Sequence, residues 1–166
     1  MPAKLPAAPP VKSAKKQSAA GKSAEASVDA SYLQTLLGYN ARRVSLQAIG
    51  LFNECMAEFG LTPVDFSVLS LIHHNPGITS RQLCSALNLL PPNLVGKISM
   101  MERRELLSKK PHPDDGRAIG LHLTGAGEKL MAQAEPTASA VELESASRLT
   151  AAETKTLLRL LQKVYL

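Results

Sequence analysis

Residues 109–123 read KKPHPDDGRAIGLHL and predict a short β-hairpin with basic side chains at its base and its tip. The Asp-Gly pair in the middle favours a tight turn, because glycine adopts positive φ at no steric cost. After the turn, Ile119, Leu121 and Leu123 alternate with small or polar residues, which is the period of a half-buried strand. The two prolines before it cannot donate hydrogen bonds to a sheet, so the first strand must be short or lie at an edge.

Two short helices are expected before this hairpin. Thr79 or Ser80 caps the first, which runs to Asn88. Two prolines then suit the start of a second helix that covers residues 93–104. Two helices with a tight connection form a helix-turn-helix, in which the second helix enters the major groove of DNA and a following hairpin acts as a wing. The alternative is a helical hairpin in a bundle, followed by a solvated surface turn.

The charge distribution favours a DNA-binding helix-turn-helix over a plain helical hairpin. Residues 1–24 carry five lysines and no acid, and residues 78–123 carry seven basic against four acidic side chains, within a net charge of +5. A basic excess in the segment with the hairpin is typical of a nucleic-acid surface. Aromatic residues make up only 4% of the chain and Trp is absent, which argues against proteins that stack single-stranded bases.

A long apolar helix is expected before the helix-turn-helix. Leucines and other apolar residues recur at steps of three and four from residue 30 to residue 59, and Gly60 ends the pattern. Thr62, Pro63 and Asp65 then supply the cap and first turn of another helix. The apolar side of the long helix is broader than one small domain needs, which indicates that it packs against a second polypeptide chain.

The C-terminal part of the chain predicts two more helices. Thr124 caps one that is interrupted at Pro136 and resumes towards Leu143. Thr150 and Glu153 form a capping box that opens a last helix with almost no polar side. Together with the first helix, it predicts symmetric dimerisation through the two chain ends.

The chain of 166 residues is large enough for one core. We expect a disordered basic tail at 1–28, an N-terminal dimerisation helix at 29–60, a DNA-binding lobe at 61–123 and C-terminal dimerisation helices at 124–166. No stretch approaches the roughly 18 apolar residues of a membrane span, and there is no secretory signal. Two cysteines do not make a disulfide framework, so a cytoplasmic location is expected. No phosphate loop, nucleophile elbow or metal-ligand spacing indicates an enzyme.

This order of elements resembles the MarR family of bacterial transcriptional regulators. The stretches that carry the likeness are LTPVDFSVL at 61–69, MERRELL at 101–107, DDGRA at 114–118 and LHLTGAG at 121–127. The resemblance implies a mainly α fold with a small β wing, that is, a winged helix-turn-helix with N- and C-terminal dimerisation helices. It also implies a homodimer that binds a pseudopalindromic double-stranded operator, usually as a repressor, without a cofactor. Many members release DNA when a small aromatic or phenolic ligand binds.

The chain departs from the family pattern at three positions. Many members have arginine where this chain has Gly96 and Met100, and glycine where it has Glu105. The operator therefore cannot be taken over from a relative. Gly96 weakens a helix by about 1 kcal/mol relative to alanine, which indicates either close approach to DNA or loose packing.

Helix faces and the wing together give a set of expected DNA contacts. Ser80 and Arg81 begin a helix, where anions are favoured, and are expected at phosphates. Asn93 and Lys97 have the chemistry to pair with bases or, for the lysine, with phosphate. The full expected set is Ser80, Arg81, Pro92, Asn93, Gly96, Lys97, Met100, Arg104, Lys110, His112, Asp115 and Arg117. An ordinary solvated side chain is the alternative for Asn93 and for Lys97.

An inducer site is expected on the first long helix. Tyr39, Arg42 and Arg43 form a polar cluster there, and arginine binds carboxylates in bidentate fashion. The resemblance adds that members sensing aromatic acids or their coenzyme A thioesters carry a similar run. The alternative is an inter-subunit salt bridge with Glu54 or Glu58.

Two further hypotheses concern the cysteines and the paired histidines. Cys55 or Cys84 would make the chain a redox-switched regulator, whereas a free cysteine is usually a small buried apolar residue. His73 and His74 would bind a metal with a wing residue (His112 or Asp114), or else simply cap the end of a helix.

Overall fold

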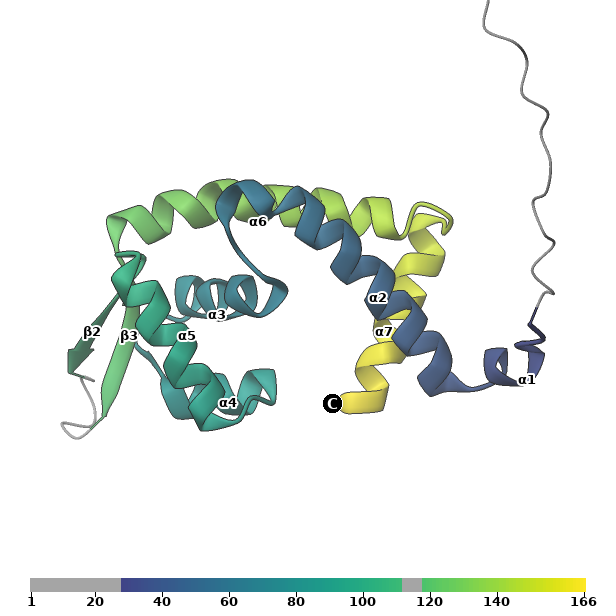
Figure 1. The fold of residues 1–166 in the computed structure, drawn as a ribbon, viewed down its shortest axis with the longest axis horizontal. Helices are drawn as coiled ribbons and strands as arrows, with labels where there is room; N and C mark the ends of the chain where they lie inside the picture. The colour runs from purple at the N-terminus through teal and green to yellow at the C-terminus, as the bar shows by residue number, and fades with distance from the viewer. Residues whose placement is uncertain (1–27, 112–117) are drawn as a thin grey trace, which may run out of the picture.

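The computed structural model of the chain describes residues 28–111 and 118–166. Its elements are α1 (Ser31–Gln34), α2 (Leu37–Cys55), a 3₁₀ turn (Ala57–Phe59), α3 (Pro63–His74), β1 (Ile78–Thr79), α4 (Ser80–Leu87), α5 (Pro91–Arg103), β2 (Leu107–Pro111), β3 (Ile119–Leu123), α6 (Gly125–Ser145) and α7 (Ala151–Tyr165). Figure 1 shows α3, α4, α5 and the strands gathered into one lobe under α6, with α2 and α7 towards the other end. The predicted fold class, mainly helical with a small β wing, is confirmed.

Local capping signals place the helices of this lobe as predicted. Thr62 and Asp65 form a reciprocal capping box at the start of α3, and Pro63 takes the first helical position. Thr79 and Gln82 do the same for α4, while α5 begins at its pair of prolines. The two capping boxes satisfy backbone N–H groups that the first turn of a helix leaves without partners, whereas the prolines of α5 have no N–H group to satisfy.

The helix expected over residues 30–59 is not continuous, and that prediction is wrong. The backbone is extended at Leu36, and α2 ends at Cys55 before a separate 3₁₀ turn. The amide of Asn40 donates to the carbonyls of Gln34 and Leu36, both at 2.8 Å. These bonds satisfy acceptors that the interruption frees. The apolar spacing continues across the break, so periodicity alone does not reveal it.

Three antiparallel strands form the sheet in the order β1-β3-β2. The pairing of β2 with β3 confirms the predicted hairpin strands, and Pro111 lies opposite Ile119 on the edge strand, where a missing donor is tolerated. The turn expected to join them lies at residues 112–117, outside the described ranges. The short β1 was not predicted. It pairs with β3, and a side chain on Gly120 would meet the carbonyl oxygen of Gly77, the residue before β1, at 2.8 Å.

The helix that follows the wing runs further than expected. The predicted interruption at Pro136 is wrong, because α6 continues through it to Ser145 (Figure 1). Buried residues lie on both sides of the proline, with Met131 and Ala134 before it and Val141 after it. Continuous packing on the core therefore offsets the hydrogen bond that proline removes from the helix.

Both helices of the helix-turn-helix end on a residue in the left-handed region. Asn88 follows α4 with φ 49°, and Glu105 follows α5 with φ 57°. After α5, the N–H of Glu105 donates to the carbonyl of Glu102 at 2.9 Å, and that of Leu106 donates to Met101 at 3.0 Å. This double closure is the Schellman motif, in which glycine is the favoured left-handed residue.

The core lies where α3, α5, α6 and β3 meet, and α2 contributes Phe52 to it. In contrast, α1 and α7 bury no residue. Large apolar side chains remain exposed on α1, α2 and α7, namely Tyr32, Leu33, Leu37, Val44, Leu46, Ile49, Leu157, Leu158, Leu160, Val164 and Tyr165. In the described ranges, none of the helices has both the length and the apolarity needed to cross a bilayer.

Candidate nucleic-acid interface

The presumed recognition helix α5 has one buried and one open side. Leu94 and Ile98 are buried against the core. Asn93 and Gly96 face outward, and a Cβ added to Gly96 would have no heavy atom within 4 Å. Packing within the described chain does not require a glycine here, and the open space leaves room for a large ligand to approach the backbone.

Lys97 lies on the boundary between the two sides and is held inward. Its Nζ lies 2.7 Å from Oδ1 of Asp65 in α3. Asp65 is only 4% exposed. The Oδ2 atom of Asp65 accepts hydrogen bonds from the hydroxyl and N–H of Thr62. Burial raises the pKa of Asp65, but the hydrogen bonds from Lys97 and Thr62 outweigh it, so this pKa lies below its usual value.

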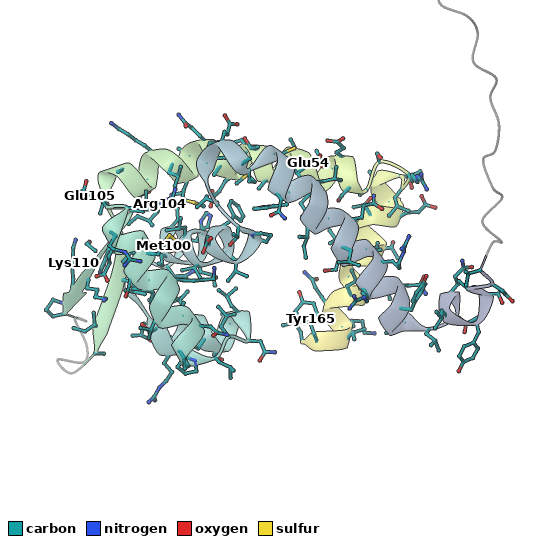
Figure 2. All side chains as sticks on the ribbon, viewed as in Figure 1. Glu54, Met100, Arg104, Glu105, Lys110 and Tyr165 are labelled. Atoms are coloured by element: carbon teal, nitrogen blue, oxygen red, sulfur yellow. The ribbon has the colours of Figure 1, made fainter. Side chains whose placement is uncertain are left out.

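Arg104 anchors the other end of α5. Its guanidinium donates two hydrogen bonds of 2.8 Å, from Nη1 to the carbonyl of Gly60 and from Nη2 to that of Phe59. Met100 is half-buried against the core (Figure 2). Thus Lys97, Met100 and Arg104, all expected at DNA, are engaged in contacts within the chain, and the helical spacing alone did not indicate this.

The remaining expected DNA contacts lie on three elements around the open side of α5. Ser80 and Arg81 are exposed at the start of α4, and Pro92 is exposed at the start of α5. Lys110 is exposed on β2, near the tip of the described part of the wing (Figure 2). His112, Asp115 and Arg117 lie outside the described residues.

Two apolar residues on the open side were missed by the sequence analysis. Leu90, just before α5, is 70% exposed, and Val95 within it is 60% exposed. Apolar side chains that reach the major groove contact the methyl group of thymine. The signal was present in the sequence, because Val95 falls on the polar side of an amphipathic helix and contributes nothing to the core.

The residues expected to bind a ligand lie on the N-terminal half of α2. Arg42 and Arg43 are exposed, and Tyr39 is half-buried. A different region contains the cavity between α2, α3 and α6, with a volume of about 500 Å³, lined by Phe52, Pro63, Phe66, Ser67, Ser70, His74, Glu135, Ala138, Ser139 and Glu142. Tyr39, Arg42 and Arg43 do not line it. Arg43 borders a separate hollow of about 340 Å³ on α2 itself.

The lining of this cavity combines two aromatic rings with polar side chains. The rings of Phe52 and Phe66 meet edge to face, with centroids 5.5 Å apart. Its volume falls within the range usual for small-molecule sites. We refer to it below as the interhelical cavity.

Both cysteines occupy structural positions. Cys55 in α2 and Cys84 in α4 are free thiols, partly buried and packed against the core. This matches the usual place of a free cysteine, and a redox switch stays a prediction.

Sequence comparison identifies relatives of this chain. The sequence model of the MarR family matches residues 61–119. The transcriptional regulator HosA from Escherichia coli O111:H- is 31% identical over 104 residues, which cover 63% of this chain and 77% of HosA.

Solved structures give the same result. The transcriptional repressor CouR, bound to a 23-mer DNA duplex, superposes with a TM-score of 0.78 at 31% identity, covering 84% of this chain and 99% of that one. The Mycobacterium tuberculosis MarR family protein Rv2887, in complex with salicylic acid, has a TM-score of 0.64 at 25% identity, covering 78% and 96%. The resemblance inferred from the wing and the helix starts is therefore confirmed, and this chain belongs to the MarR family of DNA-binding transcriptional regulators.

Proposed function

We propose that two copies of this chain form a repressor that binds a pseudopalindromic operator and releases it when an aromatic ligand binds. One observation carries the proposal. The outward side of α5 is free of packing at Asn93, Val95 and Gly96, while Lys97 and Arg104 fix the inward side. A recognition helix needs this division, because its outward side must enter the major groove while its orientation is kept.

Each exposed group has a role that matches its chemistry. Asn93 pairs with adenine, and Val95 contacts a thymine methyl. Arg81, with Ser80 beside it at the start of α4, binds a phosphate. Lys110 and the wing residues 112–117, which include Arg117, contact the neighbouring minor groove or its phosphates. Lys97 and Arg104 act on DNA indirectly, by orienting α5.

The homodimer is proposed from the exposed apolar side chains on α1, α2 and α7. Tyr165 lies at the end of α7 (Figure 2). It is 73% exposed, Val164 beside it is 67% exposed, and Leu37 at the start of α2 is 62% exposed. Patches of this kind mark association surfaces. A two-fold dimer through these helices places two recognition helices on one side, as a palindromic operator requires.

For the ligand we propose an aromatic or phenolic molecule in the interhelical cavity, stacked against Phe52 and Phe66. The relative Rv2887, solved with salicylic acid, supports this class. Glu135 and Glu142 also line the cavity, so an aromatic acid or a coenzyme A thioester needs a cation for its anionic group. We propose Arg42 or Arg43 for this role. The arginine comes either from the partner subunit or from the same chain, if the ligand extends beyond the cavity towards α2.

Selection from a random pool of duplex DNA tests the operator proposal. The wild-type protein should enrich an inverted repeat. On that site, Asn93→Ala should relax preference at one position in each half-site, and Arg81→Ala should weaken binding across all sequences and lower the salt slope by about 1. Lys129→Ala, which changes an exposed lysine on α6, is the matched control. Failure to enrich any repeat, or an unchanged preference in Asn93→Ala, would contradict the proposal.

Thermal shifts with aromatic acids, phenols and thioesters test the ligand proposal. Phe66→Ala should abolish the shift for every active compound. Substitution of the responsible arginine should raise the concentration needed for DNA release by tenfold or more for acids, and leave a neutral phenol unaffected. If both arginine variants lose the dimer but keep the response, the arginines stabilise the interface instead.

A further inference from the structure

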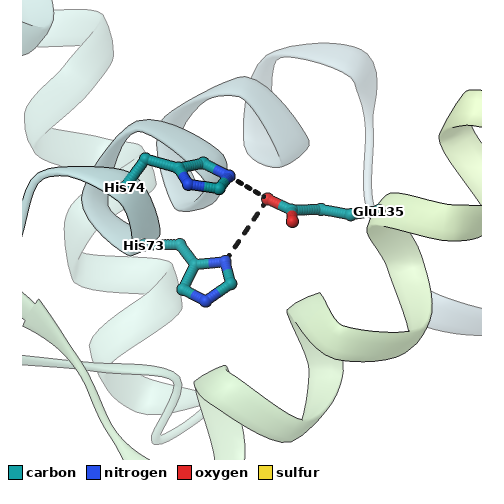
Figure 3. Close-up of side chains that lie close together, drawn as sticks. All are labelled: His73, His74 and Glu135. Carbon is teal, nitrogen blue, oxygen red and sulfur yellow. Dashed lines mark hydrogen bonds and ion pairs between the residues drawn. The ribbon is translucent and has the colours of Figure 1, made fainter.

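The end of α3 and the middle of α6 meet at a cluster of two histidines and a glutamate. Nδ1 of His73 lies 3.3 Å from Oε1 of Glu135, and Nε2 of His74 lies 2.9 Å from the same oxygen (Figure 3). The two imidazole rings lie side by side, with centroids 4.8 Å apart. Three atoms that commonly bind metals therefore converge on one point, from two different helices.

A second carboxylate lies behind this cluster. Oε2 of Glu128 lies 3.1 Å from Nε2 of His73, on the side of the ring that faces away from Glu135. A neutral imidazole has a single N–H. When Nε2 of His73 donates that proton to Glu128, Nδ1 presents a lone pair towards the Glu135 oxygen. The lone pair and the carboxylate oxygen then repel each other, and a cation bound between them removes this repulsion.

We propose that His73, His74 and Glu135 bind a divalent transition-metal ion of the Zn²⁺ type. Glu128 orients His73 through the other ring nitrogen, the arrangement commonly found behind histidines that bind metals. The wing residues His112 and Asp114, considered as partners from the sequence, are not needed for this site. Two imidazoles and one carboxylate select such an ion over Mg²⁺ or Ca²⁺, which prefer oxygen ligands.

Two of the three distances in the cluster match those around such an ion. Bonds of about 2.0–2.1 Å in a tetrahedral site separate neighbouring ligand atoms by about 3.3 Å. The two histidine–glutamate distances, 3.3 and 2.9 Å, lie close to that separation. The two histidine nitrogens lie within 4.8 Å of each other, so binding of one ion by both requires the imidazole rings to rotate towards it. The His74 side chain is 63% exposed, so an ion reaches the site from solvent and keeps a fourth position for water.

An ion at this position would link two helices of the structure, α3 and α6. α3 belongs to the lobe that carries α4 and α5, whereas α6 runs from the wing towards α7 (Figure 1). An ion shared by His73, His74 and Glu135 would join the two helices at the border of the interhelical cavity, since His74 and Glu135 also line it. Binding of the ion does not depend on the proposed ligand or operator.

The test uses the full-length protein and Zn²⁺ alone, in competition with a chromophoric chelator at neutral pH and without DNA. We expect one tight site per chain. His74→Gln and Glu135→Gln should each weaken binding by more than 100-fold, because each removes a ligand atom. Glu128→Gln should weaken it by about 10–100-fold, as expected for a carboxylate that orients a ligand.

Two controls separate this site from other metal-binding residues. Glu142→Gln changes another carboxylate of α6 that lines the same cavity, and His122→Gln changes a histidine of β3. Both should bind Zn²⁺ as the wild type does. If the His74 and Glu135 variants also bind like the wild type, the metal is held elsewhere, by the cysteines or the wing.

A spectroscopic measurement covers variants that fail to fold. Titration of wild-type protein with Zn²⁺ should shift the ring signals of His73 and His74 in the NMR spectrum and leave those of His122 in place. Absence of both tight binding and ring shifts would overturn the proposal and leave a hydrogen-bonded cluster of His73, His74, Glu128 and Glu135.

Discussion

Substitution of Lys97 by methionine should destabilise the protein before it affects any DNA contact. The change removes the ammonium group 2.7 Å from Oδ1 of Asp65 and keeps an unbranched side chain of similar length. Asp65 is then left almost fully buried, with only the hydroxyl and N–H of Thr62 as partners. A buried carboxylate that loses its cation is not compensated by water.

The magnitude follows from how deeply each partner is buried. Removal of one member of a fully buried pair costs about 3–5 kcal/mol. The side chain of Lys97 is 29% exposed, and Asp65 keeps its bonds to Thr62, so we expect about 2 kcal/mol at pH 7. For a protein of this size, that corresponds to a fall in Tm of roughly 4–8 °C.

The pH dependence gives an independent check on the same ion pair. In the folded protein the pKa of Asp65 lies below its ordinary value of 3.8, because hydrogen bonds from Lys97 and Thr62 outweigh the effect of burial. A lowered pKa contributes stability that is present above the unfolded value and is lost as pH falls through the folded value. The gap in unfolding free energy between wild type and Lys97→Met should therefore narrow as pH falls through and below the unfolded pKa of Asp65.

Urea unfolding across this pH range measures the effect, with Lys110→Met as the matched control. Lys110 is exposed on β2, so the same chemical change should leave stability within about 0.5 kcal/mol of wild type. In the double variant Lys97→Met with Asp65→Asn, much of the lost stability should return, because no buried charge remains. A Lys97→Met protein that keeps wild-type stability but loses operator affinity would refute the reasoning and assign Lys97 to DNA.

Three further substitutions test other parts of the structure. Glu105→Gly should raise the Tm by a few degrees, whereas Glu105→Ala should not. The glycine removes the strain of a left-handed non-glycine residue, about 1–2 kcal/mol, and part of this gain is lost because glycine makes the unfolded chain more flexible. Gly127→Ala should unfold the protein or lower its Tm strongly, since the new methyl group would overlap the carbonyl of Leu106, and urea titration would show this. Leu158→Asp on the exposed side of α7 should give a monomer in size-exclusion chromatography, and a retained dimer would place the interface elsewhere.

Features determined by neighbouring residues could be predicted from the sequence. The N-cap at Thr62, the capping box at Thr150 and the strands on either side of the wing turn depend on contacts within a few positions. The same holds for Gly60, which ends the 3₁₀ turn with φ 60°. Local rules therefore gave the order and type of most elements.

Features that depend on distant contacts were missed or misjudged. Lys97 was predicted on the outer side of α5 from helical spacing, but its long side chain reaches Asp65, 32 positions earlier. Likewise, Glu135 completes the cluster of His73 and His74 from a helix more than 60 positions away. Packing on both sides of Pro136 also keeps α6 continuous, against the local preference of proline.

In α5, the residues that attach the helix to the rest of the chain are different from the residues on its exposed side. Lys97 and Arg104 hold the helix to α3 and to the carbonyls of Phe59 and Gly60. The exposed positions at its N-terminal half, such as Asn93, contribute little to that attachment. Paralogues or designed variants can therefore change the exposed positions and acquire new target genes while inheriting one unchanged scaffold.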